Sequence, residues 1–338
     1  MTYQFKNLVF EGGGVLGCAY VGVVEVLDKQ SILPNITRVG GTSAGSIVAL
    51  LISLNYSSTE IMKELKELDL KKFADDDWGL LRDTTRFFHK FGWHKGKAML
   101  EWLEDIVSRK TGSPETTFGQ MQIDKEQKSF KDLYIIGTNT NTHFSTVFSH
   151  ETHSAMRIAD AIRISMSIPL FFEAVEFEND TYVDGGVLMN FPIKLFDRKS
   201  YLENDKNGIV TKAYAEYQLE SAENPFVCNT ETLGFRIESN RQRNILIGQP
   251  PERREIKNVY QFTKNLIGTV LDFQQNISLH DLDSDRTVYV INTNETSAIN
   301  FDITPTEKDT LIQSGRDSTK TYFNNFENPE IFMSNRPR

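Results

Sequence analysis

The chain has 338 residues, 39% of them hydrophobic and 25% charged, a composition that excludes the disordered and fibrous classes and is typical of a folded globular protein. Its formal net charge of -9 at pH 7 argues against nucleic acid as the main partner, because proteins that neutralise phosphates normally present a basic face. The length suits one large domain or two ordinary ones, and no internal repeat divides it.

The sequence also lacks the marks of a secreted, membrane-spanning or metal-binding protein. Its start, MTYQFKNLVFEGGG, has no basic segment followed by an apolar stretch, so we expect no secretory leader. The longest apolar run, residues 47–54, is far shorter than the roughly 18 residues that a spanning helix needs. Cys18 and Cys228 have no framework spacing, and the histidines form no HExxH or CxxC-type group, so we expect no metal site.

The first 56 residues predict alternating strands and helices. Residues 7–11 have the pattern of a short strand, and residues 18–32 have apolar positions at helical spacing up to Pro34. Residues 36–40 predict the next strand and residues 44–56 the next helix. Strand, helix, strand and helix within so short a span indicate parallel strands joined by crossover helices.

Later elements follow the same patterns. We expect strands at 130–140, 145–149, 232–238 and 286–292, a strand pair within 174–187, and a helix at 154–168. Thr304, Pro305 and Glu307 form a capping-box pattern that opens a late helix. The polar segment 197–225 and the basic segment 240–255 are predicted loops or inserted pieces, and 281–285 is predicted to be a solvated loop.

The first glycine-rich turn, FEGGGVLG, matches GxGxxG at Gly12, Gly14 and Gly17. One interpretation is a dinucleotide-binding turn, although the acidic candidates for ribose binding, Glu25 and Asp28, fall on the following helix instead of at a strand end. A second is that consecutive glycines uncover backbone N–H groups that bind an anion, including an oxyanion. A plain tight turn is the third interpretation.

The second turn, GTSAG, matches GxSxG around Ser43. A strand-to-helix elbow needs small residues on both sides of its nucleophile, and Gly41 and Gly45 meet that need. The N–H group of Ala44 and the dipole of the following helix would face the same anion as the glycine loop. The alternative is that Ser43 only caps a buried helix.

The third turn, YVDGGVLMNFP, places Asp184 at a strand end before Gly185 and Gly186. A Ser-His-Asp triad has little support, because only His280 follows the plausible acidic partners. A carboxylate at 184 could instead accept the proton of Ser43 directly. The alternative is that DGG is an ordinary turn sequence.

Together, GGGVLG, GTSAG and DGG in this order resemble the patatin-like phospholipases. Residues 161–172 (AIRISMSIPLFF) and 301–316 (FDITPTEKDTLIQSGR) are also similar to blocks of that family. The resemblance implies an α/β fold, a three-layer α/β/α sandwich with a mainly parallel central sheet, as a single domain over 1–338. The family's glycine loop often carries Arg or Lys where this chain has Leu16, so a role for that cation is missing.

The resemblance also implies a Ser-Asp dyad without histidine, metal or other cofactor. By position, Ser43 would be the nucleophile and Asp184 the general base, and the oxyanion hole would consist of backbone groups at Gly12, Gly13, Gly14 and Ala44. Gly17, Gly41, Gly45, Gly185 and Gly186 would support these turns. The implied activity is hydrolysis of phospholipid or other acyl-lipid esters through an acyl-enzyme. A nucleotide-binding oxidoreductase or sensor, and a catalytically silent scaffold, are the alternatives.

Residues 70–112 are predicted to form a helical lid or cap insertion, and residues 304–326 a C-terminal helical segment. All three tryptophans, Trp78, Trp93 and Trp102, fall in the first of these segments among several basic residues. Aromatic and basic side chains together suit a membrane interface, so we expect transient membrane contact there, in the cytoplasm or after delivery into another cell. The alternative is an amphipathic insertion that packs on the core. The oligomeric state stays open.

Overall fold

A computed structural model describes most of the chain. The described residues are 3–68, 70–73, 92–216, 224–239, 281–293, 296–298 and 300–327, with short pieces between 256 and 273. Among them, no helix combines the length and the apolar character that crossing a bilayer requires.

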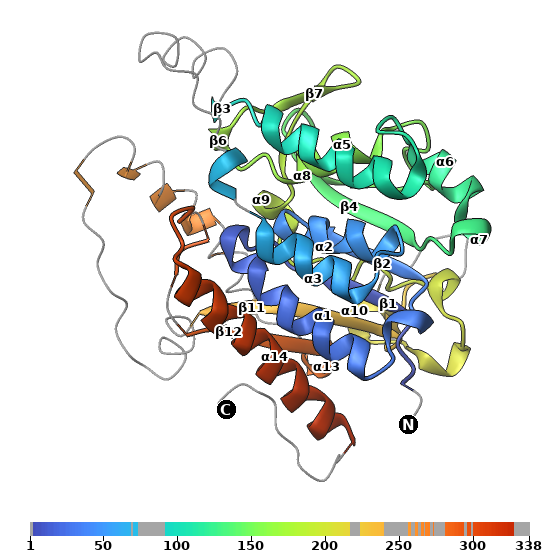
Figure 1. The fold of residues 1–338 in the computed structure, drawn as a ribbon. Coiled ribbons are helices and arrows are strands. Elements are labelled where there is room, and N and C mark those ends of the chain that lie inside the picture. Colours follow the sequence, from blue (N-terminus) through green and yellow to red (C-terminus); the bar gives the residue numbers. More distant parts are fainter. Residues whose placement is uncertain are drawn as a thin grey trace.

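The described part contains a central eight-stranded sheet (Figure 1). Five strands run parallel in the order β12, β11, β1, β2 and β4. β5 and β8 both pair antiparallel with β4, and β7 pairs antiparallel with β8. Their bounds are β1 Asn7–Phe10, β2 Arg38–Thr42, β4 Asp132–Asn139, β5 Phe144–Phe148, β7 Val175–Phe177, β8 Asp180–Asp184, β11 Thr232–Ser239 and β12 Thr287–Asn292. The predicted α/β class with a mainly parallel sheet is confirmed.

One face of the sheet carries the long helices and the main hydrophobic core. Figure 1 shows several of them in front of the strands, with α14 alongside α1 at the lower left. Their bounds are α1 Tyr20–Lys29, α2 Ala44–Ser53, α3 Ser58–Glu67, α5 Lys97–Thr111, α8 Ile158–Ser165 and α14 Pro305–Glu327. Every residue of α2 is buried, which explains why its sequence, AGSIVALLIS, has no polar face.

The capping box predicted for the late helix is present. The N–H group of Glu307 donates to the Thr304 hydroxyl at 3.2 Å, and the N–H group of Thr304 donates to the Glu307 carboxylate at 2.8 Å. The hydroxyl of Thr304 also donates to that carboxylate. These bonds satisfy backbone donors that the first turn of a helix leaves free.

The other face is covered by short elements and irregular chain. Phe196 packs there against Val9 and Tyr134, whose side chains point away from the long helices. The short elements include α9 Gly186–Met189, α10 Lys212–Ala215, β9 Gly208–Ile209, β10 Cys228–Asn229 and α13 Asp281–Asp285. The prediction of a solvated loop at 281–285 is wrong, because these residues form α13 and Asp283 is buried.

The predicted lid segment divides into pieces with different surroundings. Residues 70–73 form a 3-10 turn, β3 spans Gly92–His94 and α5 spans Lys97–Thr111. The apolar residues of α5 are buried in the main core, as the alternative of a packed amphipathic insertion expects. Residues 74–91, which hold Trp78 and most of the basic residues, lie outside the described residues, as do 240–255 and His280.

The remaining short elements lie around the same core. They are the 3-10 turns η1 Gly14–Ala19, η2 Leu33–Asn35, η3 Leu70–Phe73, η4 Lys199–Tyr201 and η5 Asp205–Asn207, the helices α6 Phe118–Ile123 and α7 Lys125–Lys128, and β6 Leu170–Phe172. β3 pairs with β6 in a small separate sheet. Of these, η1 matters most for function, because it begins within the glycine-rich turn.

Candidate active site

The strand register brings the three glycine-rich turns together at one edge of the sheet. Phe10 pairs with Gly41, Thr42 with Ile136, and Gly137 with Asp184. If each strand pairing is continued by one or two residues, Gly12, Ser43 and Asp184 lie at the same level, just beyond the carboxyl ends of β1 and β2. A Cβ atom built on Gly12 would lie 3.1 Å from the Cβ atom of Ser43. Open α/β sheets bind their ligands at this edge.

Ser43 occupies a strained elbow between β2 and α2. Its φ of 51° and ψ of -127° are rare for a residue with a side chain. The neighbouring glycines permit the turn: a Cβ atom on Gly41 would lie 2.3 Å from the carbonyl oxygen of Gly45, and one on Gly45 would lie 2.4 Å from that of Phe10. Ser43 therefore precedes the helix where a cap would lie, but its side chain does not cap it.

Asp184 ends β8 and is 3% exposed, next to the hydroxyl of Ser43. Its Oδ1 atom accepts a hydrogen bond from the N–H group of Gly186 at 2.7 Å. Burial raises the pKa of Asp184 to about 7, although the hydrogen bonds from Gly186 and Ser43 act in the opposite direction. Among the described residues, no cation forms an ion pair with this carboxylate. It is therefore partly protonated near neutral pH and can exchange a proton with Ser43.

The glycine loop leads from β1 into η1. Gly14 has a φ of 53°, and a Cβ atom there would lie 2.0 Å from the carbonyl oxygen of Ala298, so only glycine fits. That same oxygen accepts the N–H group of Val15 at 2.9 Å. The N–H group of Gly12 donates to the carbonyl oxygen of Asn190 at 3.1 Å, which leaves those of Gly13, Gly14 and Ala44 as the better candidates for holding an anion.

Two polar residues support these turns and had no assigned role in the sequence analysis. The Oγ atom of Ser165 in α8 accepts the N–H group of Ser43 at 2.9 Å. The side chain of Asn190 donates to the carbonyl oxygen of Gly12 at 3.0 Å, which ties the glycine loop to the chain after α9. Both residues lie in the quoted stretches AIRISMSIP and DGGVLMNFP, but only the tertiary contacts show what they bind.

Glu11 is a second buried carboxylate beside the glycine loop. Its Oε2 atom accepts the N–H group of Ile237 at 2.7 Å, and Asn190 Nδ2 lies 3.4 Å from Oε1. Burial raises its pKa to about 7, and the nearby charge of Arg236, whose Nε atom lies 3.9 Å away, opposes that rise. The Glu11 side chain therefore supports the glycine loop through its contacts with Ile237 and Asn190.

The acidic residues that a dinucleotide site would need are engaged elsewhere. Glu25 lies on α1 and forms ion pairs with Lys29 and Arg316, at 2.7 Å and 2.6 Å. Asp28 lies on the same helix, as the sequence predicts. Neither residue stands at the end of a second strand, where a ribose-binding carboxylate belongs. Of the two acidic candidates, neither therefore lies where it could bind a ribose.

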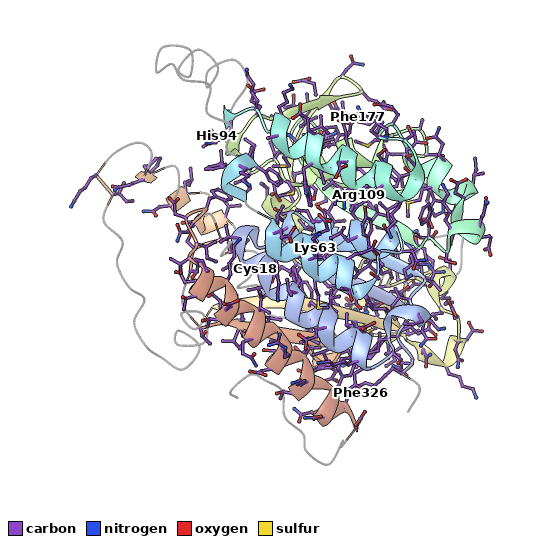
Figure 2. All side chains as sticks on the ribbon, viewed as in Figure 1. Cys18, Lys63, His94, Arg109, Phe177 and Phe326 are labelled. Carbon is purple, nitrogen blue, oxygen red and sulfur yellow. The ribbon has the colours of Figure 1, made fainter. Side chains whose placement is uncertain are left out.

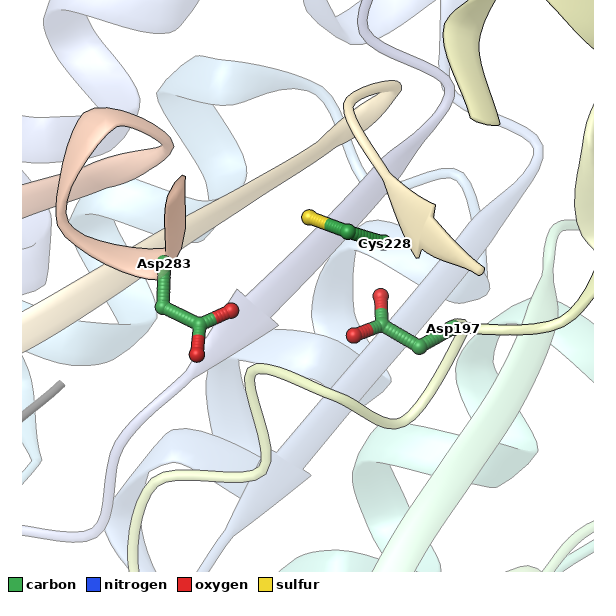
Figure 3. Close-up of side chains that lie close together, drawn as sticks. All are labelled: Asp197, Cys228 and Asp283. Carbon is green, nitrogen blue, oxygen red and sulfur yellow. The ribbon is translucent and has the colours of Figure 1, made fainter. Parts of the chain in front are cut away.

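One buried cluster contains the right atoms for a metal but has a different use (Figure 3). Asp197, Cys228 and Asp283 bring their ligand atoms within 4.8 Å of one another. The guanidinium of Arg286 donates to both oxygens of Asp197 at 2.6 Å and 2.8 Å, and to Asp283 at 2.6 Å. Because Arg286 already neutralises both carboxylates, this cluster stabilises the fold as a buried ion-pair network.

The edge of the α/β sheet combines a serine elbow, a buried carboxylate and a glycine loop. Serine hydrolases use this kind of site. A model of the family described as patatin-like phospholipase matches residues 8–197, which is more than half of the chain. The chain belongs to the patatin-like phospholipase family.

Two viral proteins are similar to this chain in sequence. The uncharacterized protein R571 of Acanthamoeba polyphaga mimivirus is 35% identical over 195 residues, which are 57% of this chain and 62% of that protein. The probable lipid hydrolase 463L of Invertebrate iridescent virus 6 is 28% identical over 218 residues, which are 63% of this chain and 72% of that protein. The matched part thus spans less than two thirds of R571.

A solved structure is similar in fold. VipD from Legionella pneumophila matches with a TM-score of 0.57 and 16% sequence identity, over 96% of this chain and 67% of that chain. At this level of identity the match supports the architecture, including the sheet and the helices that position the three turns. It carries no statement about what this chain acts on.

Proposed function

We propose that this protein is a lipid acyl hydrolase of the phospholipase A type, which cleaves carboxylic ester bonds through Ser43 and Asp184. The observation that carries the proposal is that the strand pairing brings Ser43 and the buried carboxylate of Asp184 together at one edge of the sheet, where burial raises the pKa of Asp184 to about 7. Membership of the patatin-like phospholipase family and the name of the viral lipid hydrolase support the substrate class.

In the first step, Asp184 accepts the proton of Ser43 while Oγ attacks the ester carbonyl. The N–H groups of Gly13, Gly14 and Ala44 would hold the negative oxygen of the tetrahedral intermediate, assisted by the N-terminal end of the α2 dipole. Asp184 then returns the proton to the departing alcohol, and the acyl group stays on Ser43. A raised pKa favours this exchange, because the carboxyl group must both take and release a proton near neutral pH.

In the second step, water releases the acyl group. Asp184 accepts a proton from the water as its oxygen attacks the acyl carbon, and the same backbone groups hold the second oxyanion. Collapse of that intermediate frees the carboxylic acid, and Asp184 returns the proton to Ser43. One carboxylate therefore serves both half-reactions without a histidine.

The direct test is acyl release from mixed phospholipids by the wild type, Ser43→Ala and Asp184→Asn. We expect both variants to lose nearly all activity. Ser53→Ala is a matched control, because Ser53 is also buried in α2 and its hydroxyl only bonds the carbonyl oxygen of Leu50 at 2.8 Å. Asp180→Asn in β8 controls for the second variant. Full rates in both Ser43→Ala and Asp184→Asn would overturn the assignment.

We also propose that the protein meets its substrate by peripheral contact with a membrane, acting in the cytoplasm or after delivery into another cell. The support is the mixture of aromatic and basic residues between Trp78 and Lys97. Flotation with liposomes should recover the wild type and lose a variant with Phe87, Phe88 and Trp93 changed to alanine. Equal recovery of both proteins would contradict membrane contact through this segment.

A further inference from the structure

A pocket lies beside the proposed oxyanion hole and is not used by the chemistry described above. Gly14 and Gly17 of η1 and Ala44 of α2 form one of its ends. Ala44 directly follows Ser43, and a Cβ atom on Gly17 would lie 2.9 Å from the Cβ atom of Ala44. The pocket therefore begins next to the groups that would hold the ester carbonyl.

The walls of this pocket are apolar and come from three separate parts of the chain. Ile47 lies one turn into α2, and Leu65 and Leu68 lie at the end of α3. Phe301 and Ile303, just before α14, form the opposite wall. Apolar side chains of this kind gain free energy by taking hydrocarbon out of water.

The wall that precedes α14 is held in place at both of its ends. The carbonyl oxygen of Ala298 accepts the N–H group of Val15, as described above. The ammonium group of Lys308, the charged residue of the lining, donates to the carbonyl oxygen of Leu68 at 3.0 Å. Between these ties, Phe301 packs on Phe171 with ring centroids 4.7 Å apart.

A cysteine of η1 also contributes to the lining of this pocket. Figure 2 shows Cys18, which also lines the pocket, near the start of α14 and beside α3, the helix that carries Lys63. Burial raises the pKa of the Cys18 thiol to about 12, and the charge of Lys308 acts in the opposite direction. The thiol is therefore protonated at neutral pH and contributes a small, weakly polar surface to the lining.

We propose that this pocket holds the hydrocarbon part of the substrate's acyl chain, and that Phe301 and Ile303 set the length of chain that fits. The inference rests on the proposed function, because the ester carbonyl must lie at Gly14 and Ala44 for the chain to enter here. Both wall residues lie beyond residues 8–197, which the family model matches. Chain-length preference would then depend on the segment just before α14.

The test compares kcat/KM for p-nitrophenyl butyrate and p-nitrophenyl palmitate. Ile303→Trp should fill the pocket and lower the palmitate-to-butyrate ratio at least tenfold. Phe301→Ala should open the wall and raise the ratio severalfold. Because a ratio does not depend on the concentration of folded enzyme, partial unfolding of a variant cannot imitate either result.

Ile209→Trp is the matched control, since Ile209 is exposed in β9 and should leave the ratio unchanged. Ratios within twofold of the wild type in both Ile303→Trp and Phe301→Ala would overturn the pocket assignment alone, provided that Ser43→Ala is inactive on both esters. Undiminished hydrolysis by Ser43→Ala would instead overturn the proposed function. The two failures are thus separate results of one set of assays.

Discussion

The molecule buries carboxylates in two regions, and the carboxylates of the two regions have different partners. Asp197 and Asp283 share the guanidinium of Arg286, with contacts of 2.6–2.8 Å. Among the described residues, the carboxylate of Asp184 contacts the N–H group of Gly186 and the hydroxyl of Ser43 but no cation. A buried charge that is paired stabilises one conformation, whereas one without a cation has a raised affinity for protons. The difference indicates which carboxylate supports the fold and which can do chemistry.

The largest expected effect concerns the reactive carboxylate and its serine. Ser43→Ala or Asp184→Asn should lower kcat/KM by about 10⁴-fold or more, since each removes a group on which the whole reaction depends. Acyl release from phospholipid vesicles, normalised to folded protein by circular dichroism, measures the loss. A reduction of less than tenfold in Asp184→Asn would mean that another group accepts the proton.

The second prediction concerns the ion pairs of Arg286. Arg286→Met should lower the free energy of unfolding by about 3–5 kcal/mol, because it leaves the buried carboxylate of Asp197 without its cation and leaves Asp283 with Lys194 alone, at 3.5 Å. Urea denaturation measures the change. The rate per active site, counted by titration with a fluorophosphonate, should stay within about twofold of the wild type. A specific loss of rate at full active-site occupancy would show that the ion-pair cluster takes part in catalysis.

The third prediction concerns the backbone donors of the glycine loop. Gly14→Ala should reduce kcat about 10²–10³-fold, since a methyl group would collide with the carbonyl oxygen of Ala298 and move the donors of η1. Gly268→Ala is the control, because open space surrounds that glycine. Wild-type kcat in Gly14→Ala would exclude the loop as an oxyanion hole.

The fourth prediction uses pH. Because Asp184 must be ionised to accept a proton and its pKa is raised to about 7, kcat/KM should fall about tenfold per pH unit below 7 and level off above it. Glu11 has a similar pKa, so the profile is repeated with Glu11→Gln. An unchanged midpoint assigns the titration to Asp184, and a profile that is flat from pH 5 to 8 in both proteins contradicts it.

The smallest effect concerns stability. Between the ordinary carboxyl pKa of 3.8 and the folded value of about 7, the native protein holds a proton on Asp184 that the unfolded chain has released. Stability from this group therefore falls as pH rises through that range. Asp184→Asn should be more stable than the wild type by roughly 0.5–2 kcal/mol at pH 8, and by less at pH 5. Melting curves at both values measure it, and a difference independent of pH would be inconsistent with a buried, uncompensated carboxylate.

Several parts of the architecture could be predicted because they depend on local rules. Glycine spacing identified the elbow around Ser43, and the apolar run after it identified α2. The capping box at Thr304 located the start of α14. In each case the residues that determine the structure are neighbours in the sequence, so the pattern is visible without knowledge of the fold.

Other features depend on contacts between distant residues and could not be predicted in this way. The sequence predicts that Asp283 lies in a solvated acidic loop, but it is buried because it pairs with Arg286, which also pairs with Asp197. The support that Asn190 and Ser165 give to the glycine loop and the elbow arises only when strands far apart in sequence pair. Likewise, Phe301 and Ile303 form a wall beside η1 and α2 because α14 packs against α1. The sites assigned to Ser43 and Asp184 stay predictions until they are tested.

The most direct test of the central claim is the rate at which a fluorophosphonate labels Ser43, followed by mass spectrometry of the peptide that contains GTSAG. The account predicts a single label on Ser43, a rate that rises with pH around a midpoint of about 7, and loss of labelling in Asp184→Asn but not in Asp180→Asn. Labelling of a different residue, or an unchanged rate in Asp184→Asn, would contradict it.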